Sequence, residues 1–193
     1  MVPAAYILKQ GWQTVIDRLD ANKINYFKLE KDTALTIEAY KISDYETRNA
    51  PYEGHYLHYN TQVEKHAEKV HFRAGDIVVP TQQTGIRYIL ETLEPQGVDS
   101  FFNWNFFDTV LQQKEGFSPY VFEDIALEML QKDSVLRQNF MLKKELDQQF
   151  AENWYAQLDW IFHQSNYLEK AYLNYPVYRI AKDSEVAGIL PKQ

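Results

Sequence analysis

The apolar residues of this chain change from a strand period to a helix period between residues 80 and 85, and that change restricts the fold more than any other feature. Between residues 23 and 80 β-forming residues alternate, as where Leu35, Ile37 and Ala39 fall on one face of an expected strand. Between residues 85 and 173 apolar residues recur instead at helical spacing. Strands followed by helices predict an α+β fold, with a mostly antiparallel β region before a helical C-terminal half.

We expect a helix to open the chain, because Trp12, Val15, Ile16 and Leu19 form an apolar stripe. A hairpin should follow it. The remaining expected elements are the two hairpin strands at 26–30 and 34–42, strands at 56–59, 69–72 and 77–79, helices at 86–93, at 100–110 and from 119, one long or two consecutive helices from 134, and a late strand at 177–180. The whole is predicted to be one domain over residues 1–180, followed by a loose tail at 181–193.

Composition excludes several classes of function. The 27 acidic and 20 basic residues give a net charge of -7, whereas nucleic-acid binding needs a clustered basic surface. No apolar run approaches the roughly 20 residues that span a bilayer, and the first residues lack a signal-peptide pattern. Without cysteine the chain has no disulfides and no thiolate metal ligands. We therefore expect no nucleic-acid partner and no membrane-spanning segment.

Sequence motifs for catalysis are also missing. No serine lies in a Gly-x-Ser-x-Gly or Ser-x-x-Lys arrangement, so no acyl-transfer nucleophile is indicated. The seven glycines are too dispersed to form a phosphate-binding loop. We expect no catalytic residue and no cofactor in this chain.

His55 and His58 form the one spacing that suggests a metal site. If residues 56–59 are a strand, however, the two imidazoles point to opposite faces and cannot share an ion without a bulge. Histidines bonded to backbone or water are the simpler expectation. A metal site completed by Glu53 or His71, and a hydrolase built on it, stay as alternatives.

Adjacent acids could divide acid and base roles if burial separated their pKa values. The two candidate pairs are Glu123 with Asp124 and Glu91 with Glu94. On an amphipathic helix such acids usually face solvent, and we expect that here.

The aromatic run at residues 101–107 is the most unusual local composition. We expect a central core helix, with a docking face anchored by Trp104 and Tyr120 as the alternative. Exposed aromatic rings also favour peptide or glycan binding. The candidate residues for such a surface are Tyr52, Tyr56, Tyr59 and Trp104.

Several short stretches point to one known family. They are Gly11–Trp12, Tyr52–His58, Phe72–Asp76, Glu91–Gly97, Ser100–Asp108, Leu111–Gly116 and Tyr175–Ile180. Through them the chain, over roughly residues 4–180, resembles the C-terminal region of bacterial zinc carboxypeptidase family proteins, particularly the large Bacteroidetes-type members. The resemblance is to the region that follows the peptidase domain.

A carboxypeptidase holds zinc through a His-x-x-Glu pair and a distant histidine, and this chain has no His-x-x-Glu. The resemblance therefore implies a non-catalytic accessory domain of a secreted or periplasmic peptidase-like protein, which helps to fold it or positions its substrate. Zinc would belong to the parent peptidase domain. That domain, in the same polypeptide or in a cognate chain, is the implied partner, and an independent peptide- or glycan-binding module is the alternative.

Overall fold

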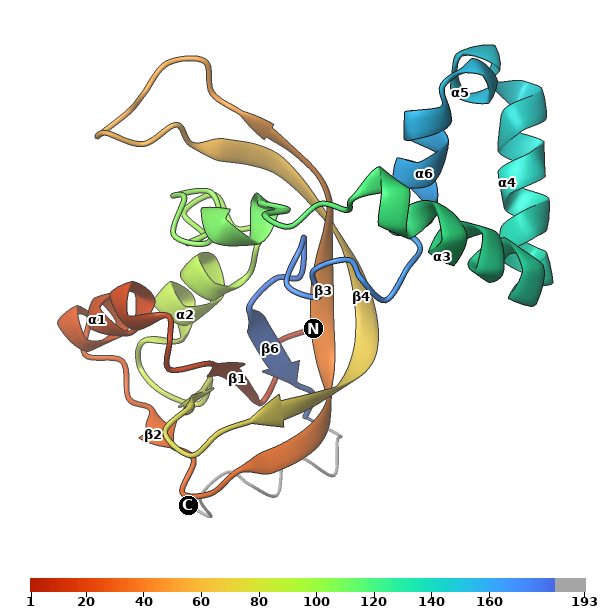
Figure 1. Ribbon diagram of the computed structural model, residues 1–193. Helices are drawn as coiled ribbons and strands as arrows, with labels where there is room; N and C mark the ends of the chain where they lie inside the picture. Colours follow the sequence, from red (N-terminus) through yellow and green to blue (C-terminus); the bar gives the residue numbers. More distant parts are fainter. Residues whose placement is uncertain (183–193) are drawn as a thin grey trace. The chain divides into compact units, whose positions relative to one another are not determined.

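The computed structural model describes residues 1–182 (Figure 1). The chain groups into two compact units. Among the described residues, the sheet unit comprises 1–112 and 173–182, and the helical unit comprises 113–172. The backbone amide of Leu173 donates to the carbonyl of Val110 at 2.7 Å, so the helical unit is an insertion whose two ends meet in the sheet unit.

The sheet unit is built on six antiparallel strands in the order β2-β5-β1-β6-β3-β4. The strands are β1 (Ala5–Leu8), β2 (Phe27–Lys28), β3 (Thr33–Thr47), β4 (His58–Phe72), β5 (Ile77–Pro80) and β6 (Val177–Ile180). All four residues of β1 are buried, and Tyr6 on this strand lies opposite Val79 of β5 and Arg179 of β6. The antiparallel β region and the late strand are thus confirmed.

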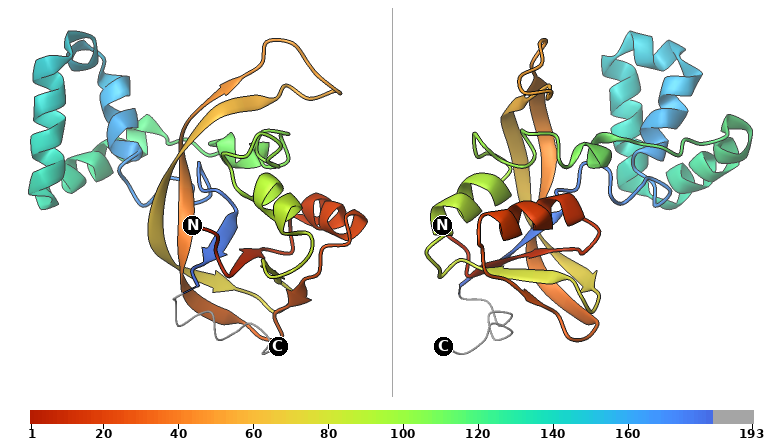
Figure 2. Two further views of the ribbon diagram at one scale, coloured as in Figure 1. Left: turned by 180° about the vertical axis from the view of Figure 1, so that it is seen from behind. Right: turned by 90° about the vertical axis from the view of Figure 1, so that its left-hand side faces the viewer.

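Strand pairing differs from the expected hairpin. β2 pairs with β5, and β3 pairs with β4 and β6, so the hairpin predicted from residues 26–30 and 34–42 is wrong. The strand expected at 69–72 and the second half of the one expected at 56–59 belong to the single strand β4, which runs beside β3 (Figure 2). Two register shifts, at Ile42/Asp44 and Asp44/Glu46, bend β3 and bring Thr47 opposite His58.

Helices α1 (Gln13–Ala21) and α2 (Ile86–Leu93) cover one face of the sheet (Figure 1). Both lie where the apolar stripes predicted them. The expectation that a helix opens the fold is wrong, because β1 precedes α1. Its four apolar residues are too short a run to reveal a strand period. The opposite face of the sheet has its own core, formed by strand residues such as Ile7, Leu35 and Phe72.

The aromatic run 101–107 is not a helix. It forms a series of turns that leads into a short 3-10 helix, η1 (Asp108–Leu111). Asn105 has a positive φ of 66°, which interrupts any regular helix here. The turns direct Phe102 and Phe107 fully into the core, so the expected core position of this run is confirmed although its helix is wrong.

The helical unit contains α3 (Pro119–Lys132), α4 (Ser134–Leu146), α5 (Gln148–Glu152) and α6 (Trp154–Phe162). From residue 134 we expected one long or two consecutive helices, and the chain forms three, each of which begins at an N-cap that accepts backbone N–H bonds: Asp133, Asp147 and Asn153. The core of the helical unit is aromatic, with Phe122, Phe140, Phe150 and Phe162 buried. Within residues 1–182 no helix is long and apolar enough to cross a membrane.

Candidate functional site

Three of the residues singled out from the sequence come together in the sheet unit. The rings of Tyr52 and Trp104 have centroids 6.2 Å apart, and the His55 ring lies 5.6 Å from that of Trp104. His55 also stacks on Phe106, at 6.4 Å and an interplanar angle of 8°. We call Tyr52, His55, Trp104 and Phe106 the aromatic platform. The other expected anchor, Tyr120, belongs to the helical unit.

A tight turn positions the first two platform residues. Tyr52 and His55 exchange backbone N–H···O bonds of 2.9 Å in both directions. The two residues between them, Glu53 and Gly54, both have positive φ, 51° and 81°, as in the primed two-residue turns that close hairpins. Paired in this way, Tyr52 and His55 have side chains on the same face.

Trp104 is held by the polar network of the preceding loop. Its backbone amide donates to the carbonyl of Ser100 at 3.0 Å, and Ser100 Oγ accepts the amide of Asn103 at 3.0 Å. The Asn103 side-chain amide donates to the carbonyl of Gly97 at 2.8 Å. Asn105 Nδ2 then ties this loop to the turn by donating to the carbonyl of Tyr56 at 3.0 Å.

The platform presents rings to solvent. Tyr52 is 60% exposed and the neighbouring Tyr56 is 53% exposed, while Trp104 is half-buried. Tyr52 and Trp104 meet at an interplanar angle of 59° and contact each other, so no flat ligand fits between them. A ligand would therefore stack on their outward faces.

The His58 ring makes different contacts from those expected. Its Nδ1 is 2.9 Å from Thr47 Oγ1, and its Nε2 is 3.0 Å from Asp108 Oδ1 and 3.2 Å from Asn105 Nδ2, so it contacts other side chains. The carboxylate favours the tautomer with the proton on Nε2, which leaves Nδ1 to accept the Thr47 hydroxyl. The ring is buried between Tyr45 and Phe102, at centroid distances of 4.9 and 5.0 Å.

These contacts bear on the metal alternative. Both nitrogens of His58 already have partners, whereas the ring of His55 stacks in the platform. Among residues 1–182 no group of three or more histidine and acidic side chains is arranged to hold a metal ion. Sequence reasoning missed Thr47 and Asp108, since neither residue carries a local signal that links it to a histidine.

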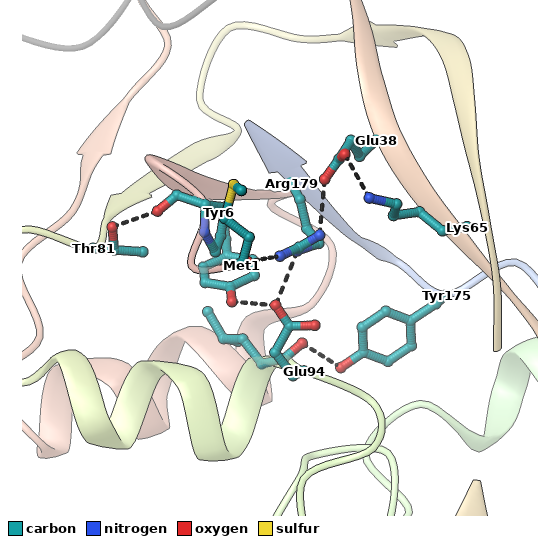
Figure 3. Close-up of polar contacts among 10 residues, drawn as sticks. Met1, Tyr6, Glu38, Lys65, Thr81, Glu94, Tyr175 and Arg179 are labelled. Atoms are coloured by element: carbon teal, nitrogen blue, oxygen red, sulfur yellow. Dashed lines mark hydrogen bonds and ion pairs between the residues drawn. The ribbon is translucent and has the colours of Figure 1, made fainter. Parts of the chain in front are cut away.

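A second polar cluster lies inside the sheet unit (Figure 3). Arg179 of β6 donates from Nε to Glu94 Oε1 at 2.9 Å, from Nη1 to Glu38 Oε2 at 2.8 Å, and from Nη2 to the carbonyl of Met1 at 2.7 Å. The Tyr6 hydroxyl donates to the same oxygen of Glu94. The expectation that Glu94 faces solvent is thus wrong, because a buried guanidinium draws it inward.

Burial also controls the tyrosines of this cluster. It raises the pKa of Tyr40 to about 12, with a further contribution from the negative charge of Glu94. Burial and Glu94 raise the pKa of Tyr6 and of Tyr175 as well, and the Tyr175 hydroxyl donates to the carbonyl of Leu93 at 2.8 Å. All three stay protonated donors at neutral pH. With each nitrogen of Arg179 bound within the protein, the cluster joins β1, β3, β6 and α2, and we assign it to the fold.

The helical unit exposes many apolar side chains. Fifteen large apolar side chains are exposed among the described residues, and ten of them belong to this unit: Tyr120, Val121, Leu127, Val135, Met141, Leu142, Leu146, Trp154, Tyr155 and Tyr167. Tyr120 is 89% exposed. A groove of about 570 Å³ also lies in this unit, lined by apolar residues such as Ile125, Met129 and Leu136 and by polar ones such as Lys132. Clustered exposed apolar groups commonly mark interaction surfaces.

Comparison with known proteins identifies no relative. No protein-family model, curated protein or solved structure matches the chain. Its function is therefore inferred from the two surfaces described above and from the resemblance seen in the sequence.

Proposed function

We propose that this chain is a non-catalytic accessory domain that binds the peptidase domain of a zinc metallocarboxypeptidase-like protein, helping to fold it or to position its substrate. The observation that carries the proposal is the concentration of exposed apolar side chains on the helical unit. Zinc and the hydrolytic chemistry would reside in the partner. As the resemblance implies, the pair would act in the periplasm or outside the cell.

The spacing of the exposed residues supports a protein partner. On α3, Tyr120 and Leu127 are seven positions apart and share one side of the helix, and on α4 Val135 and Leu142 have the same relationship. Helix faces of this kind leave apolar side chains in contact with water until another surface covers them. Burial of this apolar area is worth roughly 25 cal/mol for each Å² removed from water. A folded peptidase domain offers a large enough surface to cover more than one of these faces.

The chemistry of the chain supports an accessory role. It supplies no His-x-x-Glu pair for zinc, and the most buried charged cluster is paired within the fold. Among residues 1–182 no group of three or more histidine and acidic side chains is arranged to compete with a partner for the catalytic ion.

Binding to the peptidase domain of a resembling family member tests the proposal directly. Isothermal titration calorimetry should show a saturable complex with the wild-type chain. Tyr120→Ser combined with Leu127→Ser should weaken the complex about tenfold or more, because two exposed contacts are lost. Tyr52→Ala removes an exposed ring from the sheet unit instead and should leave this affinity unchanged.

Two outcomes would contradict the proposal. One is the absence of any complex with the wild-type chain. The other is a double variant that keeps its helical circular dichroism spectrum and binds as tightly as wild type.

A further inference from the structure

We infer that the aromatic platform of the sheet unit is a glycan-binding site, for neutral oligosaccharides of pyranose rings with equatorial hydroxyl groups. This inference does not depend on the proposed function, because it concerns a different unit and different residues. It rests on which rings are free, what surrounds them and how rigidly they are held.

Tyr52 and Trp104 are the rings available to a ligand. Phe106 is already covered, because His55 stacks on it and the guanidinium of Arg18 lies 5.8 Å from its centroid. Tyr52 is 60% exposed, and Trp104 is half-buried between its contacts with Tyr52 and His55, so both rings keep part of their surface open to solvent. The site is therefore a shallow two-ring surface.

The chemistry of a ring face selects the ligand. An aromatic face carries partial negative charge, so it attracts polarised C–H bonds. A pyranose with equatorial hydroxyls presents axial C–H bonds on its flat faces and keeps its hydroxyls at the rim. Such a sugar matches both the ring faces and a polar surround.

The polar surround of the platform fits hydroxyl groups. Asp99 Oδ1 lies 3.5 Å from Trp104 Nε1, and Glu53 occupies the turn beside Tyr52. Carboxylates accept hydroxyl protons well but repel anions, and these two outnumber the one guanidinium at the platform, that of Arg18 over Phe106, in a chain with a net charge of -7. A neutral glycan is thus favoured over a phosphorylated or acidic ligand.

The backbone of the platform argues against an extended peptide. Peptide strands bind by adding to free main-chain N–H and C=O groups. Tyr52 and His55 use these groups on each other, in two bonds of 2.9 Å. Recognition at this turn must therefore come from side chains.

The platform is also held in place before a ligand arrives. The two-residue turn fixes Tyr52, and the bond from Asn105 Nδ2 to the Tyr56 carbonyl fixes the loop of Trp104 against it. Pre-ordered rings lose little conformational entropy on binding.

Titration of the full chain with cellohexaose and chitohexaose, followed by NMR chemical shifts, tests the inference. We expect saturable shifts of the Trp104 indole signal with a Kd on the order of 1 mM for at least one of the two sugars. Tyr52→Ala should weaken binding about fivefold or more, whereas Tyr52→Phe, which keeps the ring, should change it by less than about twofold.

Tyr120→Ala is the matched control, since it removes an exposed ring from the helical unit and should leave glycan affinity unchanged. The inference is overturned if neither sugar gives saturable shifts, or if Tyr52→Ala binds as wild type does. It is also overturned if hexalysine competes for the site and added salt abolishes binding, because the ligand is then a basic peptide. Since Tyr52→Ala leaves peptidase binding intact, failure here and failure of the accessory role are distinguishable.

Discussion

Arg179 and Glu94 lie 85 positions apart in the sequence, and their side chains meet at 2.9 Å between Nε and Oε1. Only 8% of the arginine side chain and 23% of the glutamate side chain are exposed. Arg179 lies on β6 and Glu94 directly follows α2, so this ion pair fastens the helix layer to the strands.

Replacing Glu94 by alanine should therefore destabilise the protein strongly. The buried guanidinium would keep Glu38 but lose the partner of its Nε, and removing one member of a buried pair costs about 3 kcal/mol. Urea unfolding followed by circular dichroism measures the change. Glu91→Ala, an exposed acid on the same helix, should stay within about 0.5 kcal/mol of wild type. Equal effects of the two substitutions would disprove the role given to the pair.

Alkaline pH should weaken the fold through its buried tyrosines. Burial raises the pKa of Tyr40 and of Tyr178 to about 12, above the ordinary value of 10.0. Between these values the unfolded chain has lost the phenolic protons that the native state retains, so stability is full below pH 10 and falls as pH rises toward 12. The free energy of unfolding should decline over this window, and Tyr178→Phe should make the decline shallower. A decline of the same steepness in that variant would contradict the assignment.

The contact between Asp108 and His58 predicts a smaller effect. Asp108→Ala leaves the buried Nε2–H without its acceptor, which should lower the free energy of unfolding by about 1 kcal/mol. Asp108→Asn keeps an acceptor oxygen and should lose less. Chemical denaturation of both variants provides the comparison. If the asparagine variant is as unstable as the alanine variant, charge and not hydrogen bonding holds the imidazole.

Gly97 is required by space in the loop that carries Trp104. A Cβ at this position would lie 2.3 Å from the carbonyl oxygen of Glu91 and 3.3 Å from that of Glu94, and backbone atoms cannot move aside as easily as a flexible side chain. Gly97→Ala should cost about 1–3 kcal/mol and alter the fluorescence of Trp104. Gly11→Ala has nothing within 4 Å and should be tolerated. A stable Gly97→Ala protein with unchanged fluorescence would show that the loop adapts.

Local sequence patterns predicted the positions of the helices and strands better than they predicted which strands pair. The stripes that begin at Trp12 and Ile86 located α1 and α2, because helix periodicity is written in neighbouring residues. Strand pairing depends on contacts between distant segments, and nothing near residues 26–42 indicates that β2 belongs beside β5. The caps at Asp147 and Asn153 did carry a local signal, and it would have divided the last predicted helix.

In the candidate site, too, the residues could be predicted from the sequence better than the contacts between them. Tyr52 and Trp104 each stood out as aromatic residues, yet their contact depends on a turn and a loop that meet only in the folded chain. Asn105 offered a hint, since asparagine is favoured at positive φ and its presence within an aromatic run suggests a turn. Glu94 offered none, because Arg179 draws it inward from the far end of the sequence.

The place of β1 between β5 and β6 has a consequence for the growing polypeptide. β1, at residues 5–8, leaves the ribosome well before its neighbour β6, at residues 177–180. Until β6 has been synthesised, one edge of β1 has no partner, although β5 can already pair with its other edge. The inserted helices α3 to α6 are therefore synthesised before β6 can pair with β1.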